Sequence, residues 1–122
     1  MELYNYLLLK IRVIDGDSLE STLDRGMKDS SVKVIRMFGI NAPESRTKDL
    51  VEKKKGLKSK KWLINRIAAA QKAKLPIIVK SHKKITGKYG RVLGTVIIDG
   101  VDVNQEMVKL GLAVPYMGGK RK

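Results

Sequence analysis

Residues 7–24 read LLLKIRVIDGDSLESTLD and predict two strands joined by a tight turn. Apolar and polar side chains alternate over residues 7–13, which is the pattern of a strand with one buried face. Strict alternation assigns two faces, an inner one of Leu7, Leu9, Ile11 and Val13 and an outer one of Leu8, Lys10 and Arg12.

The segments that follow predict a run of short antiparallel strands. The Asp-Gly-Asp sequence at 15–17 is typical of a turn, and residues 18–24 form a second, weaker strand. A loop is expected at 25–30, after which residues 32–40 resume strand character. Three successive strands with short connections indicate a meander.

One long helix is predicted after these strands, from Gly56 to Lys74. It ends before Pro76, because the residue that precedes a proline avoids helical geometry. The apolar residues fit a helical stripe better than an alternating one, and they are Leu57, Leu63, Ile64, Ile67, Ala68, Ala70 and Ala73.

The rest of the chain adds two strands and a short helix. Strands are predicted at 77–80 and 91–98, separated by a basic loop at 83–90. Asp99-Gly100 is a hairpin signal, and Asn104 is a candidate N-cap for a helix that ends at Gly111. The order β-β-β-α-β-β-α predicts an α+β, mainly β chain: a small closed five-stranded barrel of the OB type with two helices. Five strands alone would also suit other α+β folds.

Length and charge restrict the function classes. The chain has 122 residues, so one domain is expected, over residues 1–116 with a basic tail at 117–122. Its formal net charge is +14, which implies a polyanionic partner. The absence of cysteine excludes disulfides, thiolate zinc sites and a cysteine nucleophile. Neither a secretory leader nor a membrane-spanning stretch is evident, so we expect a cytoplasmic protein that binds no membrane, with secretion as the alternative. We also expect a monomer.

Two acidic clusters and two arginines form a candidate catalytic group. The acids lie at predicted strand ends, at 15–17 and at Glu44, and the arginines lie within strands, at Arg36 and Arg91. Carboxylates hold hard divalent cations, arginines clamp phosphate, and a carboxylate near a phosphate orients or deprotonates a water. On a basic chain, this combination indicates phosphodiester hydrolysis.

The chain resembles the staphylococcal nuclease family at four motifs that occur in the family's order. They are Val13–Ser18, Val34–Glu44, Lys88–Arg91, and Val103-Asn104 followed by Lys109–Ala113. The resemblance covers residues 7–116 and implies an OB-type barrel, in agreement with the strand order. It also implies hydrolysis of DNA or RNA with little sequence preference, leaving 3′-phosphate and 5′-hydroxyl ends.

The resemblance assigns roles to individual residues. Asp17 matches a metal-binding aspartate, and the main-chain carbonyl of Ala42 matches a further ligand of the single calcium ion. Arg36 and Arg91 match the two phosphate-binding arginines, and Glu44 matches the glutamate that acts on the attacking water. The matches to substrate-contacting residues are Lys88, Tyr89 and Tyr116. Asp15 is expected to be a turn residue, or a residue that supports the metal ligands without binding the ion, rather than a metal ligand itself.

Two departures from the family pattern affect these expectations. The family usually has aspartate where this chain has Asn41, which keeps an oxygen donor but loses one negative charge. We therefore expect weaker calcium binding, or use of another divalent cation. The family also continues into a third, C-terminal helix, for which this sequence has no counterpart before Lys122.

Seven lysines between residues 48 and 61 have two interpretations. They are either a solvated helix face or a surface that tracks phosphates, and Lys53 and Lys54 are our candidates for substrate contact.

The leading function is a calcium-dependent nuclease. The alternative is a catalytically weak or inactive nucleic-acid-binding module of the same fold. Asn41 favours that alternative, whereas Arg36, Glu44 and Arg91 together oppose it.

Overall fold

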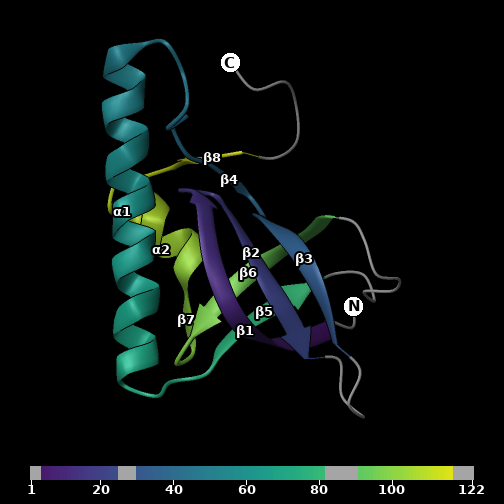
Figure 1. Ribbon diagram of the computed structural model, residues 1–122. Helices are drawn as coiled ribbons and strands as arrows, with labels where there is room; N and C mark the ends of the chain where they lie inside the picture. The colour runs from purple at the N-terminus through teal and green to yellow at the C-terminus, as the bar shows by residue number, and fades with distance from the viewer. Residues whose placement is uncertain (1–3, 25–29, 82–90, 117–122) are drawn as a thin grey trace.

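The computed structural model describes residues 4–24, 30–81 and 91–116 and shows a barrel with two helices (Figure 1). Its elements are β1 (Tyr4–Asp15), β2 (Ser18–Asp24), β3 (Ser30–Met37), β4 (Ile40–Asn41), α1 (Leu50–Lys72), β5 (Ile77–Ser81), β6 (Arg91–Ile98), β7 (Val101–Asp102), α2 (Val103–Lys109) and β8 (Val114–Pro115).

Five strands close into a barrel, which confirms the predicted fold class. The sheet order is β3-β2-β1-β5-β6, and β6 also pairs in parallel with β3. The short β7 pairs antiparallel with the end of β6, and β4 pairs separately with β8. In Figure 1, α1 runs along one side of the barrel with α2 beside it. An ion pair between Arg66 Nε and Glu106 Oε1, 2.9 Å apart, links the two helices.

In the first half of β1, the side chains face the opposite way from the prediction, because the strand contains a bulge. Lys10 has a φ of 48°, and the register with β2 shifts between Leu9 and Arg12. Leu8 is therefore buried, whereas Leu7 and Leu9 are 38% and 42% exposed, opposite to the expectation. An extra residue in a strand reverses the alternation that follows it. The second half of β1 consequently packs against the core as predicted.

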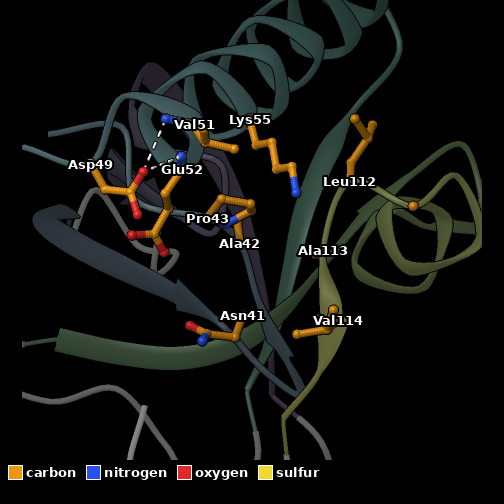
Figure 2. Close-up of a pocket in the computed structure, with 11 residues that line it drawn as sticks. Asn41, Ala42, Pro43, Asp49, Val51, Glu52, Lys55, Leu112, Ala113 and Val114 are labelled. Atoms are coloured by element: carbon orange, nitrogen blue, oxygen red, sulfur yellow. Dashed lines mark hydrogen bonds between the residues drawn. The ribbon is translucent and has the colours of Figure 1, made fainter. Parts of the chain in front are cut away.

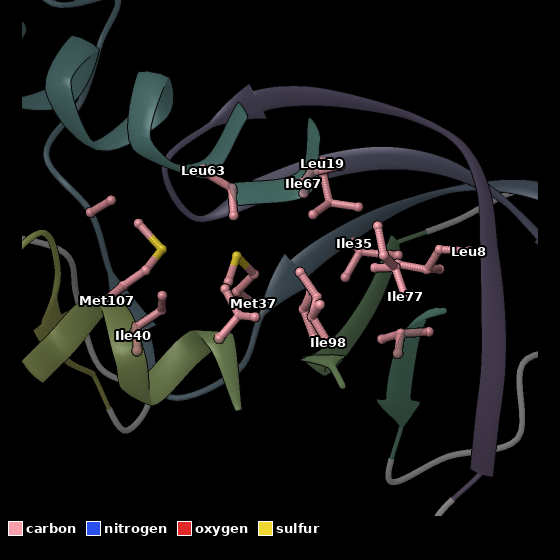
Figure 3. Packing of buried hydrophobic residues seen from close by; sticks show 14 of the residues in the cluster. Leu8, Leu19, Ile35, Met37, Ile40, Leu63, Ile67, Ile77, Ile98 and Met107 are labelled. Atoms are coloured by element: carbon pink, nitrogen blue, oxygen red, sulfur yellow. The ribbon is translucent and has the colours of Figure 1, made fainter. Parts of the chain in front are cut away.

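The barrel interior is filled by apolar side chains from the strands and from both helices, as Figure 3 shows. Many are completely buried, among them Leu19, Leu23, Ile35, Met37, Ile40, Leu63, Val79, Val96, Ile98, Val103 and Met107. The buried apolar residues form one cluster. It holds the ends of β1, β3 and β6 in fixed positions, and the candidate residues lie at those ends.

The long helix begins six residues earlier than predicted, at Leu50 instead of Gly56. Asp49 is its N-cap, and its carboxylate accepts hydrogen bonds from the backbone N–H groups of Val51 and Glu52. Periodicity missed the first turns because Leu50 and Val51 are 78% and 67% exposed there and no apolar stripe marks them. The predicted end was correct within two residues.

Two further boundaries were wrong. The strand predicted over 32–40 is interrupted after Met37, where Gly39 takes a φ of 81°, and β4 is a separate short strand. The short helix is capped by Asp102, whose carboxylate accepts from the backbone N–H of Gln105, and not by Asn104. Asn104 is instead a buried residue within the first turn of α2.

Three predicted segments lie outside the described residues. They are the loop at 25–30, except for its last residue, the basic loop at 83–90 and the basic tail at 117–122. Within the described part of the chain, neither helix has the length and apolar character needed to cross a membrane.

Candidate active site

Asp17 joins the turn between β1 and β2 to the segment after β4. Its side chain is almost completely buried. Oδ2 accepts a hydrogen bond from the backbone N–H of Ala42 at 2.8 Å, and Oδ1 accepts one from the Ser18 hydroxyl at 3.2 Å. A buried carboxylate requires such partners. The Asp-Gly-Asp turn is therefore fixed to the neighbouring segment by the carboxylate itself.

Arg36 points outward from β3, with its guanidinium held on several sides. Nη1 donates to the carbonyl oxygen of Met37 at 2.9 Å, and Nη2 donates to Asn41 Oδ1 at 3.2 Å. Nη2 also lies 3.6 Å from Asp17 Oδ2, and the Arg36 side chain is only 19% exposed. Its position is therefore set by the backbone, by a charge partner and by an amide.

Tyr116 lies against the same guanidinium. The centre of its ring is 5.9 Å from Arg36 Cζ, within the range of a cation–π contact. Its backbone N–H donates to the carbonyl of Gly39 at 2.8 Å, which fixes the tyrosine beside the end of β3. The structure thus brings Tyr116 to the group formed by Asp17, Arg36 and Asn41.

Arg91 is the first residue of β6 and lies exposed on the outer face of the barrel. In the parallel pairing of β3 with β6, Val34 is opposite Arg91 and Arg36 is opposite Leu93. Side chains two residues apart on a strand share a face, so both arginines project from one wall of the barrel. The candidate residues Lys88 and Tyr89 lie outside the described residues.

Glu44 is exposed, in the segment between β4 and α1. The next residue, Ser45, is buried, and its hydroxyl donates a hydrogen bond to Asp15 Oδ1. Sequence reasoning assigned no role to Ser45 and expected Asp15 either to form the turn or to support the metal ligands. No local signal could have revealed this hydrogen bond, because its partners are thirty residues apart.

A pocket of about 580 Å³ lies beside this group, between α1 and the chain that leads to β8. Figure 2 shows Lys55 and Val51 extending from α1, with Leu112 and Val114 on the other side and Asn41 at one end. Asn41 therefore belongs both to the Arg36 group and to the pocket wall. Lys53 and Lys54 are exposed on the same turns of α1.

The oxygen atoms near Asp17 are of the type that binds hard cations. A carboxylate, the Asn41 amide and the Ala42 carbonyl are all oxygen donors, as calcium prefers. Only one of them carries a full negative charge, and Asn41 Oδ1 already accepts from Arg36. In the part of the chain that the structure describes, no three His, Cys, Asp or Glu side chains are grouped around one point. The donor set thus fits a calcium ion in kind and predicts weak binding.

The protein is a closed OB-type barrel in which Arg36 contacts the buried Asp17, and Arg91 projects from the same wall. The model of the family described as staphylococcal nuclease homologue matches residues 34–122. This match covers more than half of the chain, which therefore belongs to that family. A search of curated proteins finds no match.

Proposed function

We propose that the protein is a calcium-dependent nuclease that hydrolyses phosphodiester bonds of DNA, RNA or both with little sequence preference. The observation that carries this proposal is the placement of Arg36, held by Asp17 and Asn41 and covered by the ring of Tyr116. An arginine fixed in this way presents a cation to a phosphate without first losing side-chain freedom.

The two arginines act on the scissile phosphate. Hydrolysis adds charge to the oxygen atoms bound to phosphorus, and positioned guanidinium groups stabilise that charge where it develops. Arg36 binds the phosphate from its fixed position on β3. Arg91 approaches from β6 on the same wall of the barrel and stabilises the transition state.

Glu44 orients the attacking water or accepts its proton, which then leaves the water as the new P–O bond forms. The bond between phosphorus and the 5′-oxygen breaks as the water attacks, and the 5′-oxygen takes up a proton from solvent, which gives a 3′-phosphate and a 5′-hydroxyl. A pure binding module has no use for a carboxylate beside two phosphate-binding arginines, because the carboxylate repels the strand. Glu44 therefore favours the enzyme over the binding module.

Asp17, Asn41 and the carbonyl of Ala42 are the residues that would hold the calcium ion. When bound, the ion supplies positive charge that stabilises the phosphoryl oxygens. The hydrogen bond from the Ala42 N–H to Asp17 keeps these residues together whatever occupies the site. Because Glu44 follows Ala42 by two residues, the same bond also limits the position of Glu44.

Positive charge on α1 and on the chain as a whole attracts the substrate. Lys53 and Lys54 are exposed, and the net charge of +14 favours a polyanion. Contacts to phosphates carry no sequence information, which agrees with low sequence preference. Lys88, Tyr89 and Tyr116 complete the proposed substrate-binding set.

The test is cleavage of supercoiled plasmid, single-stranded DNA and RNA by the purified protein, with calcium and then with an excess of chelator. We expect cleavage in calcium, loss of cleavage in chelator, and product 3′ ends that block extension until a phosphatase removes the phosphate. Binding of all three substrates without cleavage, in calcium or in other divalent cations, would contradict the enzyme and favour the binding module.

Replacing Asn41 by aspartate is expected to strengthen calcium binding. The Asn41→Asp change adds one negative charge to a donor set that holds a single carboxylate, and calcium affinity rises with ligand charge. We expect roughly tenfold less calcium at half-maximal cleavage. Calcium should also raise the thermal unfolding midpoint of the variant more than that of the wild type. An equal calcium response of the two midpoints would show that residue 41 is not a ligand.

A further inference from the structure

Gly56 lies where α1 passes closest to the backbone of Glu44. A Cβ atom added at Gly56 would lie 2.4 Å from both the carbonyl carbon and the carbonyl oxygen of Glu44, and 2.6 Å from the backbone nitrogen of Ser45. All three are backbone atoms, so they cannot move aside as a flexible side chain would. Glycine is unfavourable inside a helix, and this close approach explains why it is present.

A hydrogen bond restrains the same segment from the other side. The Ser45 hydroxyl is buried and donates to Asp15, which lies at the end of β1 two residues before Asp17. The peptide between Glu44 and Ser45 is therefore confined between the helix and the turn that carries the candidate metal ligand.

One turn further along α1, Ser59 makes a second close contact with the site. A Cβ atom added at Gly16 would lie 2.8 Å from Ser59 Cβ and 2.9 Å from Ala42 Cβ. The Ser59 hydroxyl donates to the carbonyl oxygen of Leu112 at 2.7 Å, close to β8 and Tyr116. One face of α1 thus contacts all three segments that carry candidate residues around Arg36.

We propose that α1 is the support that sets the position of Glu44, and that Gly56, Ser45 and Asp15 are positioning residues for it. This inference rests on the proposed function, in which Glu44 orients the attacking water. None of the three residues needs to touch the substrate. Their effect is to hold the Glu44 backbone, and displacements of about 1 Å in a catalytic group lower rates by as much as about a hundredfold.

Gly56→Ala is the direct test. We expect kcat for DNA cleavage in calcium to fall at least about tenfold, while KM and DNA binding in chelator stay within about twofold, because only the geometry of Glu44 changes. We also expect the unfolding midpoint to fall, whereas glycine to alanine in an unobstructed helix raises it. The matched control is Asn65→Ala on the exposed face of α1, which should leave kcat unchanged.

The Asp15–Ser45 hydrogen bond supplies a second test if Gly56→Ala does not fold. Asp15→Ala and Ser45→Ala should each lower kcat, whereas Asp15→Asn and Ser45→Thr keep the acceptor and the hydroxyl and should restore it. The calcium concentration at half-maximal cleavage should stay unchanged in Asp15→Asn. A rise in that concentration would make Asp15 a metal ligand and overturn its positioning role.

The outcomes separate this inference from the proposed function. The inference is overturned if the wild type cleaves and the Gly56→Ala variant is more stable and equally active. The proposed nuclease function would then stand. If the wild type does not cleave, the proposed function falls, and with it the role of Glu44. A lower midpoint in Gly56→Ala would then show that the close contact of α1 with this segment is structural only.

Discussion

Glu44→Gln and Arg91→Ala should each reduce calcium-dependent cleavage by at least about a hundredfold, the effect of losing one positioned catalytic group. Glutamine keeps the size of the Glu44 side chain but cannot accept a proton from water. Alanine at residue 91 removes the cation to which we assign stabilisation of the transition state. Both side chains are exposed at the surface of the barrel, so neither change should affect folding. Initial rates on plasmid DNA at saturating calcium provide the measurement.

Two matched variants test whether the effect belongs to the site. Glu106→Gln on α2 makes the same chemical change in a carboxylate whose ion pair with Arg66 links the two helices. Arg12→Ala removes an exposed arginine whose side chain is 65% accessible and pairs with Glu20. Both should cleave at rates within about twofold of wild type, since neither residue belongs to the candidate site. Wild-type rates in Glu44→Gln and Arg91→Ala would refute the assignment of the active site.

Alternating side chains made the barrel predictable, and local irregularities limited the prediction. The strands at 18–24, 77–80 and 91–98 agree closely with β2, β5 and β6 because apolar residues on them face one core. The bulge at Lys10 was not predictable, since lysine gives no signal for a positive φ. Hydrophobic periodicity likewise could not locate the start of α1, whose first residues are exposed.

The candidate site shows the same division. The motifs that contain Asp17, Arg36 and Asn41 were recognisable from the sequence, and the structure places these side chains together. The contacts that hold the motifs in place join residues far apart in the chain. Ser45 with Asp15 and Gly56 with Glu44 are of this kind. Such contacts depend on how the elements pack, and a single sequence does not contain that information.

Asn104 is the clearest case of a residue whose role depends on packing. It lies in the first turn of α2 and is 1% exposed. Its Oδ1 accepts from the backbone N–H of Val96 at 3.1 Å, and its Nδ2 donates to the carbonyl oxygens of Phe38 at 2.9 Å and Gly94 at 3.2 Å. One amide thus satisfies three backbone groups on β6 and at the end of β3. Its partner Phe38 follows Arg36 by two residues.

Asn104→Leu should therefore destabilise the protein severely. Leucine has a similar volume but removes the partner of the Val96 N–H and of the Phe38 carbonyl, whereas the Gly94 carbonyl keeps its hydrogen bond from the Phe38 N–H. Each unsatisfied buried group costs about 1–3 kcal/mol. We expect a total loss of at least about 3 kcal/mol in the free energy of unfolding. Urea denaturation followed by circular dichroism measures this loss directly.

Two further variants, Gln105→Leu and Asn104→Asp, test whether the loss of stability comes from the buried amide. Gln105→Leu places the same side chain on the exposed face of α2 and should change stability by no more than about 0.5 kcal/mol. Asn104→Asp keeps the acceptor for Val96 but removes the donor to Phe38 and Gly94, and it adds a buried charge. It should therefore be at least as damaging as leucine. If Asn104→Leu unfolds at the same urea concentration as Gln105→Leu, water or a rearranged backbone satisfies these groups. The end of β3, which positions Arg36, would then not depend on α2.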